Sequence, residues 1–475
     1  MPEEPLLDVL RHTVGPAHVL TGDSLGAWEQ DRRQRRPQGK ALAVVRPADT
    51  VQVAAVVRAC AATGTPIVPQ GGNTSLSLGA TPDASGRELV LSLSRLHAVR
   101  AIDPHNLSMT VEAGCILHNA QQAAQQAGLL FPLSLASEGS CTVGGNLASN
   151  AGGTQVLRYG NTRDLCLGLE VVTAQGEVWN GLRGLRKDNT GYDLRHLLIG
   201  SEGTLGIITA ATLKLFPQPA AQLTAWVAVA SIEQAVVLLG LAQQYLSAGL
   251  TGFEVMGRPG LELVARHCPQ WRVPLLAEMA CPWFVLLENS DCESENHARN
   301  RFEALMEAAL AADCIQDAVI AQNQSQAQTF WQVRESISQA QAREGLNIKH
   351  DIALPIARIP AFVAHTDALL AQAIAGVRVV NFGHLGDGNL HYNVQAPVGC
   401  DAAVFLREQE ALVNQIVYDA VAQFGGSFSA EHGVGALKVA QLEQYQSPVA
   451  LGWMRAIKQA LDPQNLLNPG RVLRR

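Results

Sequence analysis

The chain has 475 residues, more than a single hydrophobic core usually organises, so we expect two or three domains. Hydrophobic residues make up 47% and charged residues 16% of the sequence, which is typical of a folded protein and excludes a largely disordered one. The net charge of −7 argues against a nucleic-acid-binding protein, which normally presents a basic surface.

The cysteines and the N-terminus bear on cellular location. Nine cysteines are scattered along the chain without a CxxC pair or zinc-finger spacing, which fits a reducing compartment. The first residues, Met1–Glu4, are acidic and are not followed by an apolar signal segment. No apolar run reaches the roughly 20 residues that a membrane-spanning helix needs. We therefore expect a cytoplasmic protein without a transmembrane segment.

Hydrophobic periodicity predicts alternating helices and strands in the first part of the chain. The predicted helices are 5–20, 51–62 and 117–127, and the predicted strands are 41–45, 66–69, 89–93, 99–102 and 108–112. Glycine clusters and short strands dominate residues 130–216. The proline-rich segment Phe216–Pro219 ends this part and marks the first predicted domain boundary.

The second part of the chain alternates strands and helices in the manner of an α+β domain with an antiparallel sheet. Its predicted strands are 223–229, 251–256, 283–287 and 315–321, and its predicted helices are 232–247 and 294–313. From about residue 425 the sequence returns to glycine-rich loops. We therefore expect an N-terminal helical segment (1–36), a first domain (37–218), a second domain (219–424) and a C-terminal segment (425–475) that rejoins the first domain.

Three glycine-rich segments lie in the first domain, at Pro69–Leu76, Gly139–Asn146 and Gly200–Gly206. No G-x-G-x-x-G hexamer is present, so a nicotinamide-binding Rossmann site is excluded. The spacing of a P-loop occurs once, but Gly145-Asn146 follows where Lys-Ser/Thr would stand. One such loop is more often an ordinary turn, but three within about 135 residues present enough backbone N–H groups for a large phosphorylated cofactor.

In chain order, the motifs PxGGxTSL, GxxxxGGNxAxNAGG and SEGTLGIIT resemble the FAD-binding domain of the vanillyl-alcohol oxidase superfamily. The resemblance implies an α+β fold in which FAD lies extended between two subdomains, with its pyrophosphate on these loops. Covalently flavinylated relatives often carry histidine directly after the paired glycines, whereas Asn73 stands there, so non-covalent FAD is implied. The positions that match the cofactor contacts are Gly71, Gly72, Asn73, Thr74, Ser75, Gly139, Thr142, Gly145 and Ile207.

The segment Val379–Val394 carries two histidines around Gly386–Asn389, which has the composition of a tight hairpin turn. If this turn pairs Leu385 with Leu390, His384 lies directly opposite His391, with Cβ atoms about 5 Å apart. Two imidazoles so placed can hold one ion. Asn393, two residues beyond His391, then points to the same face of the hairpin.

The segment Glu431–Gly435 offers the third ligand, since a carboxylate beside a histidine between glycines is unusual for a structural loop. His384, His391 and Glu431 would leave coordination positions open, as in a catalytic rather than a structural zinc site. The same three residues also suit Fe(II) or Mn(II), so zinc is the expected metal but not the only candidate.

The motifs W-x-x-R-E, K-H-D-x-x-L-P, GHLGDGNLHYN and EHG together resemble the FAD-linked D-2-hydroxy acid dehydrogenases. Residues 330–338 are predicted to form a helix and residues 347–355 a strand. The implied reaction is oxidation to the 2-oxo acid, with metal-assisted deprotonation of the hydroxyl and hydride transfer to the flavin. The implied roles are carboxylate binding by Arg334, Ser338 and Lys349, a distal polar contact by Asn393, base and substrate contact by His432, and metal ligation by His384, His391 and Glu431.

The residues after GDGNL bear on the substrate. Related glycolate and D-lactate enzymes tend to have His-Pro there, whereas this chain has His391-Tyr392-Asn393, which favours the dicarboxylate branch of the family, with D-2-hydroxyglutarate as the expected substrate. Two positions depart from the family: Ser338, where Thr is more frequent, and Ala353, where Ser is usual. D-lactate, D-malate or glycolate oxidation is the alternative within the family, and a metal-dependent hydrolase and a flavin-binding sensor are the alternatives outside it.

The electrons taken from the substrate must reach an acceptor. Because no nicotinamide motif and no membrane span are predicted, we expect a soluble acceptor such as electron-transfer flavoprotein. A homodimer is compatible with this expectation.

Overall fold

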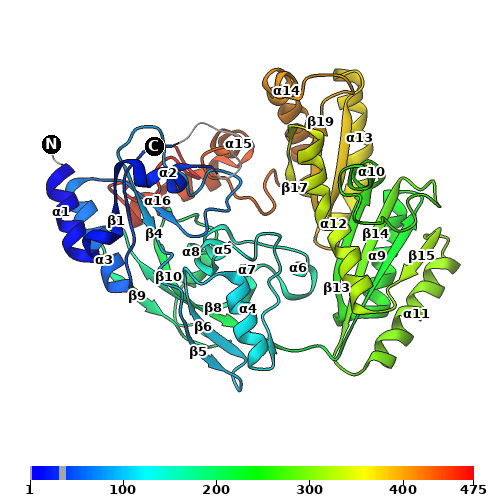
Figure 1. The fold of residues 1–475 in the computed structure, drawn as a ribbon, viewed down its shortest axis with the longest axis horizontal. Coiled ribbons are helices and arrows are strands. Elements are labelled where there is room, and N and C mark those ends of the chain that lie inside the picture. Colours follow the sequence, from blue (N-terminus) through cyan, green and yellow to red (C-terminus); the bar gives the residue numbers. More distant parts are fainter. Residues whose placement is uncertain (1–2, 32–38, 475) are drawn as a thin grey trace. The chain divides into compact units, whose positions relative to one another are not determined.

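A computed structural model describes residues 3–31 and 39–474 and divides into two compact units (Figure 1). Unit 1 comprises residues 1–152, 160–218 and 431–475, and unit 2 comprises residues 153–159 and 219–430. Of the predicted N-terminal segment, residues 32–36 lie outside the described part. The short segment 153–159 is grouped with unit 2, although its neighbours on both sides in the sequence belong to unit 1.

The first sheet of unit 1 is a small βαβ arrangement. Its strands, in spatial order, are β1 (Val19–Leu20), β2 (Ala41–Val45), β4 (Glu88–Ser92) and β3 (Ile67–Gln70). Strands β2, β4 and β3 are parallel, and β1 joins β2 in the antiparallel sense. Helix α3 (Thr50–Thr63) connects β2 to β3; it begins at Asp49, whose side chain accepts from the Gln52 N–H, and ends at Gly64 with φ +65°.

The second sheet of unit 1 is antiparallel. Its strands, in spatial order, are β5 (Val99–Asp103), β6 (Ser108–Glu112), β10 (Ile207–Lys214), β8 (Cys166–Val172) and β9 (Val178–Gly181). A two-stranded pair of β7 (Leu129–Leu130) and β11 (Phe216–Pro217) closes the domain at the predicted exit. The other helices of unit 1 are α1 (Glu3–Val14), α2 (Gly26–Glu29), α4 (Leu117–Gln126), α5 (Val143–Ser149), α7 (Thr162–Leu165), α8 (Leu194–Leu198), α15 (Val439–Tyr445) and α16 (Pro448–Leu461).

The C-terminal segment rejoins unit 1 through the first sheet. Leu467 forms a parallel bridge with Ile67 of β3. Arg471 makes two hydrogen bonds to the Glu88 carboxylate, at 2.7 and 2.8 Å, and both side chains are buried. A buried carboxylate is costly unless it is paired, so this ion pair holds the tail against β4.

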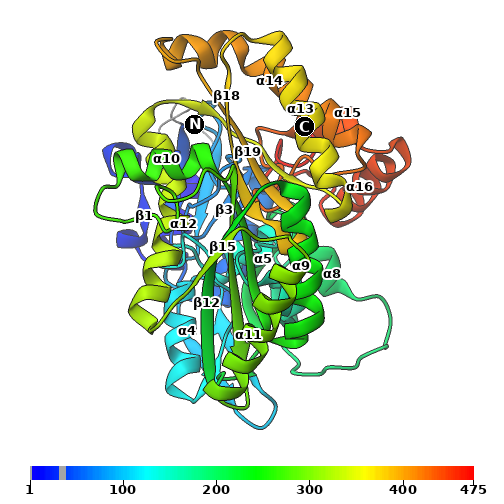
Figure 2. The same cartoon turned by 90° about the vertical axis from the view of Figure 1, so that its right-hand side faces the viewer.

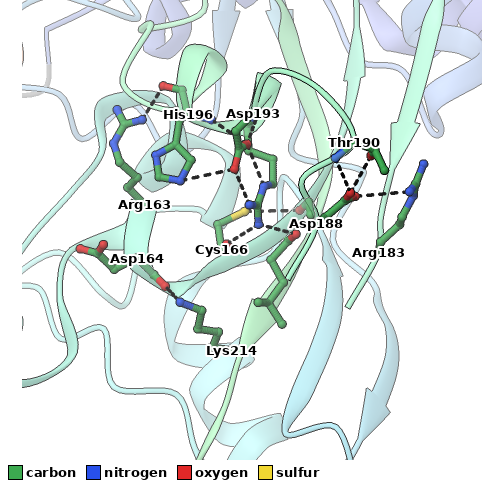
Figure 3. Close-up of polar contacts among 12 residues, drawn as sticks. Arg163, Asp164, Cys166, Arg183, Asp188, Thr190, Asp193, His196 and Lys214 are labelled. Carbon is green, nitrogen blue, oxygen red and sulfur yellow. Dashed lines mark hydrogen bonds and ion pairs between the residues drawn. The ribbon is translucent and has the colours of Figure 1, made fainter. Parts of the chain in front are cut away.

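The connection between β9 and α8, residues 182–193, is held by polar side chains (Figure 3). Asp188 accepts hydrogen bonds from Thr190 and Arg183. Asp193 caps the start of α8, and Arg163 donates to the carbonyls of His196 and Ile199. These contacts fix the chain immediately before the glycine-rich segment at 200–206.

Unit 2 is built on one large antiparallel sheet. Its strands are β12 (Ala221–Val229), β13 (Leu250–Gly257), β14 (Trp283–Asp291), β15 (Asp317–Ile320), β16 (Asn347–Ile348), β17 (Asp351–Ala353), β18 (Arg378–His384) and β19 (Asn389–Gln395). Their spatial order is β15-β12-β14-β13-β18-β19-β16, and β17 also pairs with β19. The helices are α6 (Val156–Tyr159), α9 (Ile232–Leu246), α10 (Arg258–His267), α11 (Glu295–Ala311), α12 (Gln324–Glu344), α13 (Ile359–Ala373) and α14 (Ala402–Gln423).

Helices cover both faces of this sheet, with α12 on one side and α9 and α11 on the other (Figure 2). Trp226, Met256 and Phe284 pack against α10 and α12 in one core cluster. The alternate residues of the same strands, such as Val227 and Val285, are also fully buried. Double coverage explains why β12 reads as a continuous apolar run rather than as an alternating strand.

Two predicted elements differ from the structure. The helix predicted over 5–20 ends at Val14, because Gly15 has φ +87° and Pro16 begins a separate short 3-10 turn. The strand predicted over 347–355 is divided into β16 and β17, with Lys349 and His350 between them. Within the described residues, none of the helices combines the length and the apolar character needed to cross a bilayer.

Glu344, at the end of α12, ties three elements of unit 2 together. Its carboxylate lies 2.6 Å from Arg378 of β18, 2.7 Å from His267 of α10 and 3.2 Å from Arg266. Hydrogen bonds from Arg378 and His267 lower the pKa of Glu344 to about 2. The ionised carboxylate therefore stabilises the folded state at neutral pH.

We expect Glu344→Gln to lower the free energy of unfolding by about 1–2 kcal/mol at pH 7, since the group is partly exposed to solvent. Because the folded-state pKa is depressed, this contribution is complete above the unfolded-state value of about 4.3 and disappears as the pH falls towards 2. Urea unfolding of the wild type and the variant between pH 7 and pH 3 measures the difference between their free energies of unfolding. Glu303→Gln, on the exposed side of α11, is the control. A difference that stays constant with pH would contradict a stabilising role of the ionised Glu344 carboxylate.

Candidate active site

The first two glycine-rich segments of unit 1 pack directly against each other. A Cβ atom added to Gly72 would lie 2.0 Å from the carbonyl oxygen of Ser140, and one added to Gly71 would lie 2.3 Å from Thr142 Oγ1. No side chain fits at such distances, so the two loops require glycine at both positions. The backbone after β3 is thus held against the N-terminal end of α5.

The neighbourhood of Thr142 fits a polar ligand. Thr142 is the residue before α5; it is 5% exposed, and its Oγ1 has no hydrogen-bond partner within the described residues. A buried hydroxyl without a partner costs free energy unless a ligand or water completes it. Gly71, Gly145 and Thr142 therefore form a cradle whose chemistry fits a phosphate group.

The remaining predicted cofactor contacts differ in their surroundings. Asn73 has φ +52°, and its Nδ2 donates to the carbonyl of Gln30. Ser75 Oγ accepts from the Gly79 and Ser77 N–H groups, so this hydroxyl braces its own loop. Thr74 is half-buried in the same loop, Gly139 is exposed, and Ile207 begins β10 and is 1% exposed.

The predicted register of the histidine hairpin is wrong by two residues. Phe382, not His384, pairs with His391 across β18 and β19. The connection is a 3-10 turn over Leu385–Asp387, closed by Gly388 with φ +84°. On its other side, His384 pairs with Glu254 of β13.

The two imidazoles nevertheless share one face of the sheet. His384 is a diagonal neighbour of His391, and diagonal neighbours across an antiparallel pair lie on the same side. Their ring centroids are 5.6 Å apart. Asn393, Glu254 and Phe382 lie on this side too, which is the side covered by α12.

His384 and His391 are two of the three predicted metal ligands and both lie in unit 2, whereas the third, Glu431, begins the C-terminal part of unit 1. Glu431 follows directly after Ala430, whose N–H donates to the Asp351 carbonyl. Imidazole nitrogens and carboxylate oxygens are the ligands that zinc takes in catalytic sites, so the donor chemistry fits a divalent cation.

Glu254 is a buried carboxylate that sequence reasoning missed. Its Oε1 lies 2.6 Å from His384 Nδ1, and its Oε2 accepts from Arg334 Nε at 2.8 Å. Burial alone would raise the pKa of Glu254, but the charges of His384 and Arg334 outweigh burial and hold this pKa below its usual value. The Nδ1 contact fixes the orientation of the His384 ring, as a hydrogen-bonded carboxylate does for a metal-binding histidine.

Arg334 is fixed on more than one side. Beyond the Nε contact, one terminal nitrogen lies 2.6 Å from Glu254, and the guanidinium carbon lies 5.0 Å from the centre of the Phe382 ring. Glu254 thus occupies the Nε edge, so only the outer edge of the guanidinium can meet a substrate carboxylate.

The other predicted substrate contacts lie at different depths. Ser338, one turn after Arg334 on α12, is exposed, and Lys349 is half-buried between β16 and β17. His350 is buried, with Nδ1 2.8 Å from the Tyr392 carbonyl and Nε2 2.8 Å from Asn414 Oδ1, which anchors the backbone beside Lys349. Asn393 is 3% exposed and donates from Nδ2 to Gln341 of α12.

Glu254 could have been found from sequence by one weak signal. It is an acidic residue within the apolar strand Thr251–Met256, and a charge in such a run needs a partner. The partners are 80 and 130 residues away along the chain, so no local pattern names them.

Two families of known proteins match separate parts of this chain. Residues 218–472 match the C-terminal domain of FAD linked oxidases, and residues 41–181 match an FAD binding domain. The chain belongs to the FAD-linked oxidase family. The predicted α+β fold, with an FAD-binding domain of the vanillyl-alcohol oxidase type and a cap domain built on an antiparallel sheet, is confirmed.

Similar FAD-linked oxidases carry a common name. The chain is 41% identical over 440 residues to "D-2-hydroxyglutarate dehydrogenase" of Xanthomonas citri pv. viticola, covering 92% of this chain and 90% of the relative. It is 36% identical to the protein of that name from Stutzerimonas stutzeri, covering 99% of both chains. It is 35% identical to the mitochondrial one of Arabidopsis thaliana, covering 92% and 76%.

Solved structures share the fold at low sequence identity. p-Cresol methylhydroxylase with substrate bound superposes with a TM-score of 0.75 at 17% identity, covering 100% of this chain and 97% of that one. 4-Ethylphenol oxidase from Gulosibacter chungangensis gives the same TM-score and identity, covering 99% and 97%. At this identity the likeness concerns the fold alone.

We expect Gly72→Ala to abolish FAD binding, because the added Cβ would meet the Ser140 backbone at 2.0 Å and force the loops apart. The ratio of flavin to protein absorbance in the purified variant measures the loss. Gly452→Ala is the matched control, since Gly452 lies in α16 of the same unit with open space around its Cα. A stoichiometric flavin content in Gly72→Ala would disprove the assignment of this loop.

Proposed function

We propose that this FAD-linked oxidase oxidises D-2-hydroxyglutarate to the corresponding 2-oxo acid. The observation that carries the proposal is the pair of His384 and His391 on one face of the unit 2 sheet, joined through Glu254 to Arg334, in a chain that also holds an FAD-binding domain. The name shared by its relatives supports this substrate.

The chain's own residues would hold two groups. FAD, bound without a covalent link on the Gly71, Gly72 and Thr142 loops, supplies the hydride acceptor. A divalent cation, with zinc the first candidate, would be held by His384, His391 and Glu431 and would supply a Lewis acid that makes a hydroxyl more acidic.

Arg334 and Lys349 would bind the α-carboxylate. The outer edge of the Arg334 guanidinium presents two parallel N–H donors, which match the two oxygens of a carboxylate. Because Glu254 and Phe382 already fix this guanidinium, little of its rotational freedom remains to be lost on binding. Ser338, exposed one turn later, would add a hydroxyl donor.

His432 would accept the proton of the substrate hydroxyl. An imidazole titrates near neutral pH and is the side chain most often used for this purpose. The Ser77 hydroxyl donates to the His432 carbonyl at 2.9 Å, which fixes the backbone at this residue.

Asn393 would select for a second carboxylate. One N–H of its amide is taken by Gln341, and the other is left to meet a distal oxygen. The physiological electron acceptor would be a soluble protein such as electron-transfer flavoprotein, and the site of action would be the cytoplasm.

The substrate assignment is tested by following flavin bleaching after anaerobic addition of D-2-hydroxyglutarate, D-lactate, D-malate or glycolate. We expect the highest kcat/KM with D-2-hydroxyglutarate. In Asn393→Ala this value should fall about 10- to 100-fold, since a hydrogen bond to a charged group is lost, while D-lactate changes little. An equal loss for both acids would disprove the distal contact. No bleaching by any of the four would disprove the function.

Removal of the metal gives a separate test. After treatment with a strong zinc chelator, we expect turnover to fall to the buffer blank while the flavin absorbance stays, because the proposed ligands and the FAD loops are different residues. Zinc added back should restore turnover. Full activity in a sample shown by elemental analysis to contain no metal would contradict the metal's role.

A further inference from the structure

The segment Glu431–Gly435 carries both a proposed metal ligand and the proposed base. It contains two glycines with positive φ, Gly433 at +75° and Gly435 at +53°, so its own backbone does little to restrict it. Catalytic groups must be held within about 0.5 Å of their working positions. Contacts from elsewhere must therefore hold this loop.

Glu202 provides the main contact. Its Oε1 accepts from the Val434 N–H at 2.7 Å, and its Oε2 accepts from the Gly435 N–H at 2.8 Å. Two successive backbone N–H groups beside left-handed residues form a small anion-binding cup, and here the carboxylate of Glu202 fills it. A Cβ atom on Gly433 would lie 2.7 Å from Glu202 Oε1, so the loop is pressed directly onto this carboxylate.

Ser77 holds the same loop from its other side. The Ser77 hydroxyl donates to the His432 carbonyl, and the Ser77 carbonyl accepts from the Ala436 and Leu437 N–H groups. A Cβ atom on Gly435 would lie 2.0 Å from the Ser77 carbonyl oxygen. Both anchors therefore hold the loop at His432 and in the five residues that follow it.

Glu202 is itself rigidly placed. It adopts φ +53°, its N–H donates to Ala148 at the end of α5, and its carbonyl accepts from Asn468 Nδ2. Part of the residue reaches the surface, but its carboxylate lies within the fold, where burial raises its pKa against the opposing effect of the Val434 and Gly435 N–H groups. Because its carboxylate is buried, Glu202 contributes to holding the loop rather than to the solubility of the protein.

We propose that Glu202 is a positioning residue for His432 and Glu431, and that it does not itself touch the flavin, the metal or the substrate. Glu202 stands in the SEGT motif, which sequence analysis assigned to cofactor binding. The inference rests on the proposed function of His432 and Glu431. Beyond that function, we infer that Glu202 and Ser77, in the glycine-rich part of unit 1, set the position of His432.

Glu202→Gln is the decisive variant, because it keeps the shape but turns an amide N–H group towards a backbone N–H donor. We expect the amides of residues 434 and 435 to exchange with deuterium at least about tenfold faster. The flavin content and the midpoint of thermal unfolding should stay close to wild type. Zinc affinity should fall about tenfold, and kcat with D-2-hydroxyglutarate about 10- to 100-fold, with KM changed less than about threefold.

Two further variants test the second anchor of the loop and provide a control. Ser77→Ala removes one hydrogen bond to the His432 carbonyl and leaves Glu202 in place, so we expect a smaller fall in kcat in the same direction. If Glu202→Gln does not fold, Ser77→Ala still tests whether contacts to this loop position His432. Glu443→Gln, in α15 of the same unit, removes a carboxylate paired with Arg455 and Arg474 and should leave every readout unchanged.

The inference is overturned if Glu202→Gln keeps wild-type kcat and zinc affinity per bound flavin, or if its only defect is loss of FAD. A wild-type protein that fails to oxidise D-2-hydroxyglutarate would overturn the proposed function instead. In that case deuterium exchange at 434 and 435 and zinc affinity still decide whether Glu202 holds the loop.

Discussion

One buried carboxylate organises the candidate site in unit 2. Glu254 is fully enclosed, and its two oxygens are divided between His384 on β18 and Arg334 on α12. Removing either partner would leave a charge without compensation in the interior, which typically costs 3–5 kcal/mol. The sheet and the helix above it are therefore locked in the one arrangement that satisfies this carboxylate.

The same constraint explains why polar residues gather beneath α12. Most of that face of the sheet is an apolar core around Trp226 and Phe284. Glu254 of β13 and His384 of β18 lie on this face, and so do His391 and Asn393 of the next strand, β19. A polar group is stable there only with a partner, so the residues proposed for metal and substrate are already oriented before either arrives.

Unit 1 meets a different requirement by different means. Its loops approach each other so closely that Gly71 and Gly72 leave no space for a side chain, and the hydroxyl of Thr142 beside them has no partner among the residues that the structure describes. The C-terminal loop is held by Glu202 and Ser77, which both belong to glycine-rich segments or their immediate neighbours. Glycine thus serves close packing here rather than flexibility.

The sequence by itself determined the residue types and the local elements. The motifs identify the FAD-linked oxidase family, and apolar periodicity locates strands such as β12 and helices such as α12, because both depend on contacts within a few residues. Only the tertiary structure decided the register of His384 with His391, the sharing of Glu254 and the anchoring by Glu202. The contacts of Glu254 and Glu202 join residues 80 to more than 200 positions apart, and all three features follow from how whole sheets and loops pack.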